Sequence, residues 1–132
     1  MSTVKDKSGF NIEAAELLIQ EDLYCSSIHC SYYGCFQYIM FTLKSHLNIT
    51  YEQLKNSTSG DSHVNTIQKI SQEYRNKGKS FTEAGNLSRD LNILKNTRIK
   101  ADYSPDVIGD ELSQSTLRLS KRLIMELKTT FR

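Results

Sequence analysis

Arg98 is the residue of this sequence whose position points most directly to chemistry. Residues 80–101 repeat apolar side chains every three or four positions, as a helix with one buried face does. Arg98 falls on that face, where the spacing expects a hydrophobic residue. Its fork of N–H donors matches the geometry of a phosphate group, so Arg98 is a candidate ligand-binding residue. A structural ion pair with Asp102, one turn later, is an equally good interpretation.

Asp102 and Tyr103 are the candidates for proton transfer beside Arg98. Cleavage of RNA by its own 2′-hydroxyl needs a group that moves protons near neutral pH, as well as a cation that stabilises the phosphate. A tyrosine with a pKa of about 10 is a poor base at pH 7, and an aspartate with a pKa of about 3.9 is a weak one without burial. The structural alternative is that both residues cap the helix end and fasten the turn before Pro105.

Tyr32 and Tyr33 are further candidate ligand-binding residues, together with Tyr103. Neighbouring residues on a helix point about 100° apart, so one of the paired rings can pack in the core while the other lines a groove or a dimer surface. Packing of the pair in the core is the alternative interpretation.

The cysteines do not form a recognisable metal site. Cys25 and His29 are four residues apart on one helical face and could supply half of a site, but no second pair with ligand spacing exists. Cys25, Cys30 and Cys35 are spaced by five, so they step around a helix by about 140° and share no face. We therefore expect reduced thiols, no metal and no cofactor.

The periodicity along the chain predicts helices only, with no alternating strand pattern. A flexible N-terminus is expected over residues 1–9, and the last helix is expected to begin with Ser104 as its N-cap and Pro105 in its first position. The other predicted helices cover residues 11–22, 28–47, 63–77 and 80–101. Together they indicate an all-α fold, an antiparallel bundle of four to five helices.

Local signals mark several of these boundaries. Ser80 and Glu83 have the spacing of a capping box, and Thr50 and Gln53 have the same spacing before a brief turn. Gly34 lies inside the second helix, where it costs about 1 kcal/mol relative to alanine. A helix that packs closely against the backbone at Gly34 would offset that cost.

Composition sets the broad class of the protein. The 132 residues, 38% hydrophobic and 24% charged, fit one globular domain spanning residues 1–132. The net charge of +2 is too small to indicate a nucleic-acid partner by itself. No segment reads as a membrane span or a secretion signal, so we expect a cytoplasmic protein.

Two segments resemble the HEPN superfamily of small prokaryotic helical domains. Residues 14–43 contain the Tyr32-Tyr33 pair followed by small and aromatic residues, similar to the second helix of that family. Residues 94–103, LKNTRIKADY, are similar to the Arg-x-x-Ala-Asp-Tyr end of its penultimate helix. The order and separation of the two segments also match, so the resemblance covers nearly the whole chain.

The resemblance implies a homodimer, often encoded beside a nucleotidyltransferase, with some members acting as metal-independent ribonuclease toxins. Those members use an arginine, matched here by Arg98, and a histidine after four to six intervening residues. Tyr103, Ser104 and Pro105 hold those positions here, and no histidine follows His63. His46 and His63 are expected at a helix end and in a loop, distant from Arg98 in sequence though free to approach it in space.

Two functional hypotheses follow. The first is a non-catalytic or weakly catalytic HEPN-like module, a homodimer that binds a nucleotide, RNA or a partner nucleotidyltransferase through a groove centred on Arg98. The alternative is a metal-independent ribonuclease or toxin whose site lacks the usual histidine, with Arg98 holding phosphate and Asp102 or Tyr103 moving protons. The missing histidine argues against family-type ribonuclease activity.

Overall fold

The structure is a computed structural model that describes residues 3–56 and 60–132, and the secondary structure in these two ranges consists of helices. The sequence predicted four to five helices, and the sixth is the short α3, at the brief turn expected after Thr50. The helices are α1 (Val4–Gln20), α2 (Tyr24–Leu47), α3 (Tyr51–Lys55), α4 (Ser62–Asn76), α5 (Phe81–Tyr103) and α6 (Asp110–Thr130). The all-α prediction is confirmed.

Side-chain caps explain where several helices begin. The predicted capping boxes at Thr50 and Ser80 are both present: each side chain accepts a hydrogen bond from the backbone N–H three residues on, and Gln53 or Glu83 bonds back to the cap. Gly78, with φ +94°, follows the end of α4 in the left-handed conformation that glycine tolerates.

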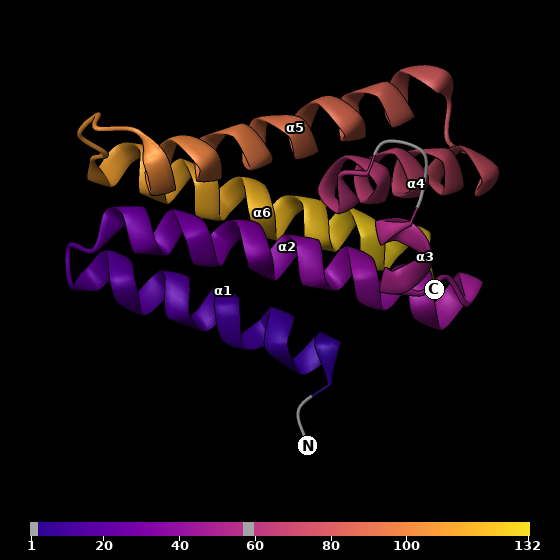
Figure 1. Ribbon diagram of the computed structural model, residues 1–132, viewed down its shortest axis with the longest axis horizontal. Coiled ribbons are helices and arrows are strands. Elements are labelled where there is room, and N and C mark those ends of the chain that lie inside the picture. The colour runs from indigo at the N-terminus through magenta and orange to yellow at the C-terminus, as the bar shows by residue number, and fades with distance from the viewer. Residues whose placement is uncertain (1–2, 57–59) are drawn as a thin grey trace.

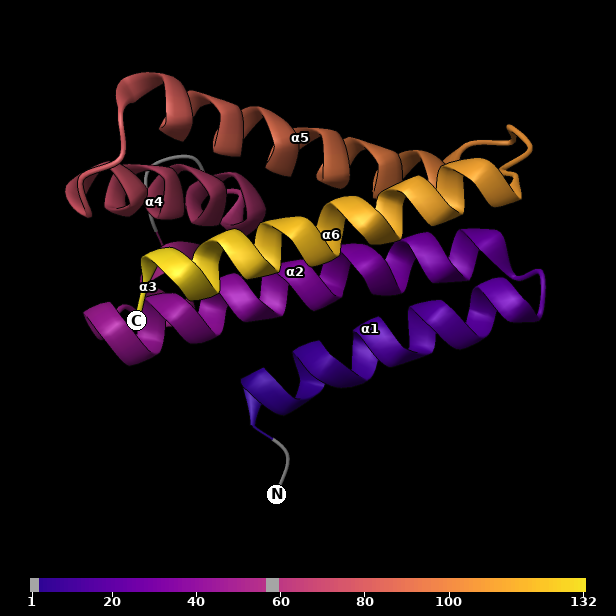
Figure 2. The same cartoon turned by 180° about the vertical axis from the view of Figure 1, so that it is seen from behind.

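α2 is the central helix, in contact with α1, α4, α5 and α6 (Figure 1). α1 runs antiparallel to α2, and α5 runs antiparallel to α6 (Figures 1 and 2). α2 and α6 run in the same direction, and the Ser120 hydroxyl of α6 donates a hydrogen bond of 2.6 Å to the Ser31 carbonyl of α2. Neighbours along the chain such as α1 and α2 or α5 and α6 are thus antiparallel, whereas the α2–α6 pair is parallel.

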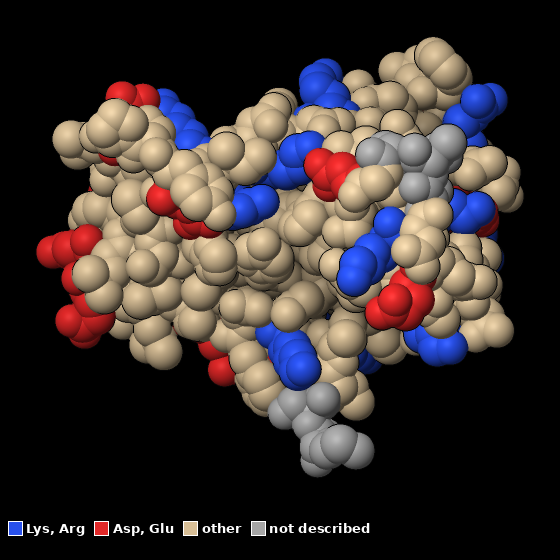
Figure 3. Space-filling model, viewed as in Figure 1, with Lys and Arg blue, Asp and Glu red and all other residues tan. Residues whose placement is uncertain are grey.

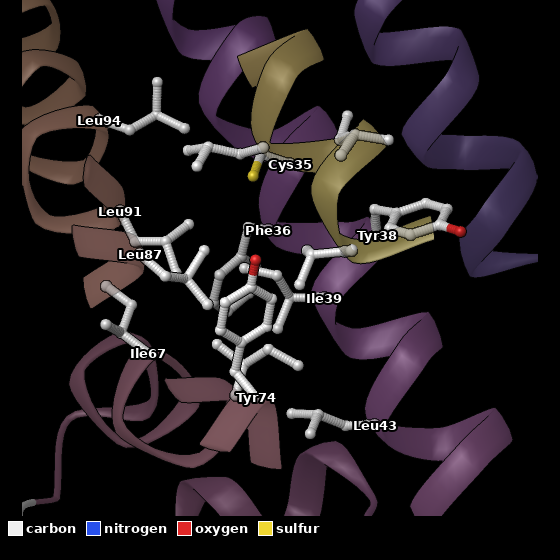
Figure 4. Packing of buried hydrophobic residues seen from close by; sticks show 14 of the residues in the cluster. Cys35, Phe36, Tyr38, Ile39, Leu43, Ile67, Tyr74, Leu87, Leu91 and Leu94 are labelled. Carbon is white, nitrogen blue, oxygen red and sulfur yellow. The ribbon is translucent and has the colours of Figure 1, made fainter. Parts of the chain in front are cut away.

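The main core lies between α2 and the helices around it. Leu87, Leu91 and Leu94 of α5 point toward the face of α2 that carries Cys35 and Phe36, and Tyr74 of α4 reaches the same cluster (Figure 4). Burial of each large apolar side chain contributes about 1.5–3 kcal/mol. The apolar stripe predicted for α2 is confirmed at the buried positions Ile28, Tyr32, Cys35, Phe36, Ile39 and Leu43.

The N-terminal segment differs from its prediction. α1 begins at Val4 rather than near Asn11, and residues 4–9, expected to be flexible, are helical. Thr3 forms a capping box with Asp6, an aspartate in place of the glutamate or glutamine that usually marks this motif. The buried Ser8 hydroxyl also donates a 2.6 Å hydrogen bond to the Gly34 carbonyl, which ties this turn to α2.

The predicted start of the last helix was also wrong. The last helix begins at Asp110, with Gly109 as its N-cap, and not at Pro105. The Ser104 hydroxyl instead accepts a hydrogen bond of 3.1 Å from the Asp106 N–H, which makes a local turn. The helix predicted over residues 63–77 agrees with α4, so His63 lies in the first turn of that helix and not in a loop. The small polar residues NSTSGDS over 56–62 are typical of an exposed loop, and this segment falls partly outside the described residues.

One apolar residue of the stripe predicted over residues 80–101 is not buried. Phe81 is 76% exposed because it is the first residue of the helix, beyond the reach of the core, although Ala84, Leu87, Leu91, Leu94 and Ala101 are buried as expected.

No helix in residues 3–56 and 60–132 is both long enough and apolar enough to cross a membrane.

Gly34 is the point of closest approach between α1 and α2, as its place inside the second helix suggested. A Cβ atom built there would lie 2.6 Å from Cδ1 and 2.9 Å from Cγ1 of Ile12, and 3.3 Å from the Ser8 carbonyl oxygen. Contacts of a Cβ atom shorter than 3.0 Å essentially never occur, so a larger residue would force the Ile12 side chain to shift and disturb the packing of α1 on α2.

We expect Gly34→Ala to lower the free energy of unfolding by about 1–2 kcal/mol, because the overpacking outweighs the better helix propensity of alanine. Gly85→Ala is the matched control: Gly85 is an exposed glycine inside α5 with no atom within 4 Å of a built Cβ, so the substitution should stabilise by up to about 1 kcal/mol. Urea denaturation measures both. Equal stabilisation by the two alanines would contradict the close packing.

Candidate functional site around Arg98

Arg98 of α5 lies against two aromatic rings of α2. Its guanidinium carbon is 5.2 Å from the centroid of the Tyr32 ring and 5.6 Å from that of the Tyr33 ring. Only 12% of the side chain is exposed. The sequence therefore placed the cation correctly on the inner side of α5, where the ring faces provide part of the stabilisation that water would otherwise give.

The hydrogen bonds of Arg98 are few for so buried a guanidinium. Nη1 donates to Oδ2 of Asp102 at 3.4 Å, one turn along α5, which confirms the expected ion pair. This distance is long for a charge-assisted bond. The buried Nε has no hydrogen-bond partner within the described residues. Most of the five N–H groups of Arg98 thus make no hydrogen bond within the described residues.

Asp102 also binds His29 of α2. Nδ1 of His29 lies 2.9 Å from Oδ2 and 3.2 Å from Oδ1 of Asp102, although the two residues are 73 positions apart in the chain. The antiparallel packing of α2 against α5 brings them together. The side chain of His29 is 47% exposed, and its ring centroid is 4.8 Å from that of Tyr33. The carboxylate fixes Nδ1 and leaves Nε2 of the imidazole unengaged.

His63 reaches the same cluster from the start of α4. Its ring stacks on Phe36 with the centroids 4.4 Å apart, and its Nδ1 lies 2.5 Å from the Tyr32 hydroxyl. Its ring centroid is 6.0 Å from that of Tyr33, so both imidazoles flank this tyrosine. Asp61, the N-cap of α4, accepts hydrogen bonds from the backbone N–H groups of residues 63 and 64 and so fixes the start of the helix.

The electrostatics favour neutral forms of His63 and Tyr32. Burial and the neighbouring Arg98 lower the pKa of His63 below its usual value, with a further contribution from Lys95, while Asp61 opposes them. Burial raises the pKa of Tyr32, and Arg98 acts in the opposite direction. We therefore assign the proton of the shared hydrogen bond to the Tyr32 hydroxyl, which donates to Nδ1 of His63 and leaves the Nε2–H of His63 as a donor.

The candidate residues from the sequence have different outcomes. Tyr32 is buried and Tyr33 is half-buried, so the pair divides between core and site as one interpretation expected. Asp102 is in the site. Tyr103 is 76% exposed and its side chain makes no hydrogen bond or ion pair with another described residue, so its part in ligand binding stays a prediction.

The two histidines were missed as site residues by the sequence analysis. His29 shares a face of α2 with Tyr33 and Phe36, at spacings of four and seven, and this periodicity was the available signal. The sequence analysis instead paired His29 with Cys25 as half of a metal site, whereas its partner in the structure is Asp102. His63 lies 35 residues before Arg98, and nothing in the local sequence indicates that α4 brings it beside Phe36.

Viewed as in Figure 1, the molecule is hollowed over the junction of α2, α4 and α5, and both basic and acidic side chains stand around the hollow (Figure 3). In the described ranges no group of three or more His, Cys, Asp or Glu side chains is arranged to hold a metal ion. Besides its tyrosines, the charged and titratable groups of the site are therefore one guanidinium, two imidazoles and a carboxylate.

The lowered pKa of His63 makes stability depend on pH. In the unfolded chain the imidazole takes up a proton near pH 6.5, whereas the folded chain resists it, so the stability is full above about pH 6.5 and falls as the pH drops through the folded value. We expect the fall in the free energy of unfolding between pH 7 and pH 5 to be smaller in His63→Gln than in the parent chain. Chemical denaturation across this range measures it, and parallel curves for the two proteins would contradict the assignment.

Neither a family model nor a curated protein matches the sequence, so the HEPN resemblance stays a prediction and the site is interpreted from its own geometry.

Proposed function

We propose that this protein binds the phosphate group of a nucleotide or of RNA at Arg98. The observation that carries the proposal is a guanidinium 12% exposed, with one long contact to Asp102 and an unpartnered Nε. A buried cation is stable only when acceptors satisfy its donors, and the described residues supply few of them. A purely structural arginine would be expected to have its donors engaged by carboxylates.

The groups around Arg98 fit a phosphate ester better than a simple anion. A guanidinium and a phosphate form paired, nearly parallel hydrogen bonds. The Nε2–H of His63 adds a neutral donor, and Lys95 lies close enough to affect its titration. The exposed His29 ring and the half-buried Tyr33 ring offer faces on which a base can stack, and such stacking contributes about 1–3 kcal/mol per base.

A HEPN-like homodimer is part of the proposal. In this arrangement two copies of the bundle pack near their Arg98 sites, and each site is completed at the subunit contact. Support comes from the apolar side chains Ile99, Tyr103 and Val107 at this end of the molecule, which are 40%, 76% and 96% exposed. Such residues are frequent in protein interfaces. A nucleotidyltransferase is the alternative partner for this surface.

Arg98→Ala should weaken binding of a fluorescein-labelled single-stranded RNA of about 15 nucleotides by roughly tenfold or more, because a charge-assisted contact contributes about 1.5–3 kcal/mol. Arg98→Lys keeps the charge but not the fork and should give an intermediate affinity. Fluorescence anisotropy measures both. Arg118→Ala is the control, since Arg118 is an exposed arginine of α6 outside the site.

Two further measurements, and one result that would reject the proposal, complete this test. The melting temperature of each variant separates loss of binding from loss of fold. Adenosine monophosphate as a competitor distinguishes a nucleotide site from one that needs a longer strand. If Arg98→Ala and Arg118→Ala bind the RNA as the parent chain does, Arg98 is structural and the proposal is rejected.

A ribonuclease is the second candidate, and one specific observation favours it: two imidazoles flank the Tyr33 ring on which Arg98 lies, whereas the family motif has its histidine after the arginine. His29, oriented by Asp102, would take the proton from a 2′-hydroxyl through Nε2, and the hydroxyl oxygen would attack the adjacent phosphorus. Arg98 would stabilise the charge that develops on the phosphate. The departing 5′-oxygen would take its proton from the imidazolium form of His63, which must first pick up a proton from solvent, and the products are a 2′,3′-cyclic phosphate and a 5′-hydroxyl end.

If the protein cleaves RNA by this route, His29→Asn and His63→Gln should each reduce the rate by about 100-fold or more, the usual contribution of a general acid or base. Asp102→Asn should have a smaller effect, because Asp102 only orients His29. His46→Gln, at the far end of α2, is the matched control. Gel analysis of a structured RNA in the presence of EDTA gives the rates. Cleavage that persists in both site variants would exclude this mechanism and leave the binding function as it stands.

A further inference from the structure

A second site is suggested by a cavity on another face of the molecule, between α1, α2 and α6. Its volume is about 510 Å³, within the range of about 300–1,000 Å³ for small-molecule sites. Ile12, Tyr38 and Ile124 contribute apolar surface to its lining, one from each helix. Phe10 of α1 and Met125 of α6 also line it and remain 56% and 61% exposed, which is unusual for side chains of this size.

The cavity has one closed and one open end. At the closed end α1 and α6 are in contact: Ala15 and Ile19 pack against Leu117, and Glu16 forms an ion pair with Lys121. α1 and α6 flank α2 along this face (Figure 2), and the lining continues from this contact toward the start of α1 and the end of α6. An elongated guest would therefore enter from that open end.

Two lysines stand at the open end. The ammonium of Lys5 lies 5.4 Å from the Phe41 ring centroid, and that of Lys128 lies 5.5 Å from the Tyr38 ring centroid. These two rings are neighbours on α2, with their centroids 5.6 Å apart. Neither lysine has a carboxylate within 4 Å in the described chain, so both charges are available to an anion.

The acidic residues of the lining offset these charges only in part. The hydrogen bonds with Thr3 lower the pKa of Asp6, and Lys5 lowers it further, so Asp6 is an anion that offsets part of the Lys5 charge. Glu13 is about two turns from Lys5 along α1, nearer the closed end. The cavity thus combines an apolar body with a cationic mouth.

We infer that this cavity binds a single-chain amphiphilic anion, with the alkyl chain along Ile12 and Ile124 and the carboxylate between Lys5 and Lys128. The hydrophobic contribution comes from the chain and from coverage of Phe10 and Met125, at about 25 cal/mol per Å² of apolar surface buried. The lysines select the sign of the head group. This site is separate from the Arg98 site, and neither proposal depends on the other.

Isothermal titration calorimetry of the full chain with decanoate, below its critical micelle concentration, tests the inference. Decanoate should bind at one site per chain and more tightly than decanol or decyltrimethylammonium, which share its chain length but not its charge. Lys5→Glu and Lys128→Glu should each weaken the binding of decanoate by roughly tenfold, because repulsion replaces attraction at the head group. Arg118→Glu makes the same charge change elsewhere on α6 and should leave the affinity unchanged.

A blocking variant keeps the test independent of charge. Gly9 lines the cavity, and a Cβ atom built there has no neighbour within 4 Å, so Gly9→Phe should fill the space without unfolding α1. It should abolish binding of decanoate while the circular dichroism spectrum stays helical. Equal affinities for decanoate, decanol and decyltrimethylammonium would overturn the inference. So would a dimer that Gly9→Phe dissociates, because a second copy would then be the occupant.

Discussion

The position of one cation between two helices determines the structure of the Arg98 site. Arg98 replaces a hydrophobic residue on the inner side of α5, and removing a guanidinium from water costs several kcal/mol unless other groups compensate. The rings of Tyr32 and Tyr33 supply part of that compensation, at about 0.5–2 kcal/mol for a cation over an aromatic face. Asp102 supplies another part through a 3.4 Å contact. The other N–H groups of the guanidinium have no acceptor among the described residues. An anionic ligand would therefore gain more binding free energy from Arg98 than from the ion pairs on the surface, whose charges are already paired.

Tyr32 connects this site to the core. Its buried ring packs with Phe36 on one side and carries Arg98 on the other, and its hydroxyl meets His63 at the start of α4. A shift of α2 along its axis would therefore move the aromatic support of Arg98 and the partner of His63 together. The close contact at Gly34 limits such a shift, because Ile12 of α1 already fills the space beside that residue. The positions of α1, α4 and α5 relative to the site are thus set through one helix.

Much of the fold could be predicted because its signals are local. Capping boxes at Thr50 and Ser80 and the stripe of apolar residues along α2 are readable within a few turns, and Arg98 was recognisable as an exception to its own stripe. The errors arose where one local sequence pattern is compatible with two different structures. Ser104 before Pro105 has the pattern of a helix start, yet its hydroxyl makes a turn with Asp106. The site was incomplete in the sequence analysis because His29 and Asp102 are 73 residues apart and meet only through the packing of α2 on α5.

α2 also separates the two surfaces for which ligands are proposed. Tyr33 and Tyr38 lie five residues apart on this helix, and five residues turn a helix by about 140°. Tyr33 consequently faces Arg98, whereas Tyr38 lines the cavity beside α1 and α6. The backbone hydrogen bonds of a long helix keep its turns in register, so α2 moves as a unit rather than turn by turn. Occupancy of the cavity could affect the Arg98 site only by displacing α2 as a whole, and the contact of Gly34 with Ile12 and Ser8 lies between them. The geometry therefore favours two surfaces that bind their ligands independently.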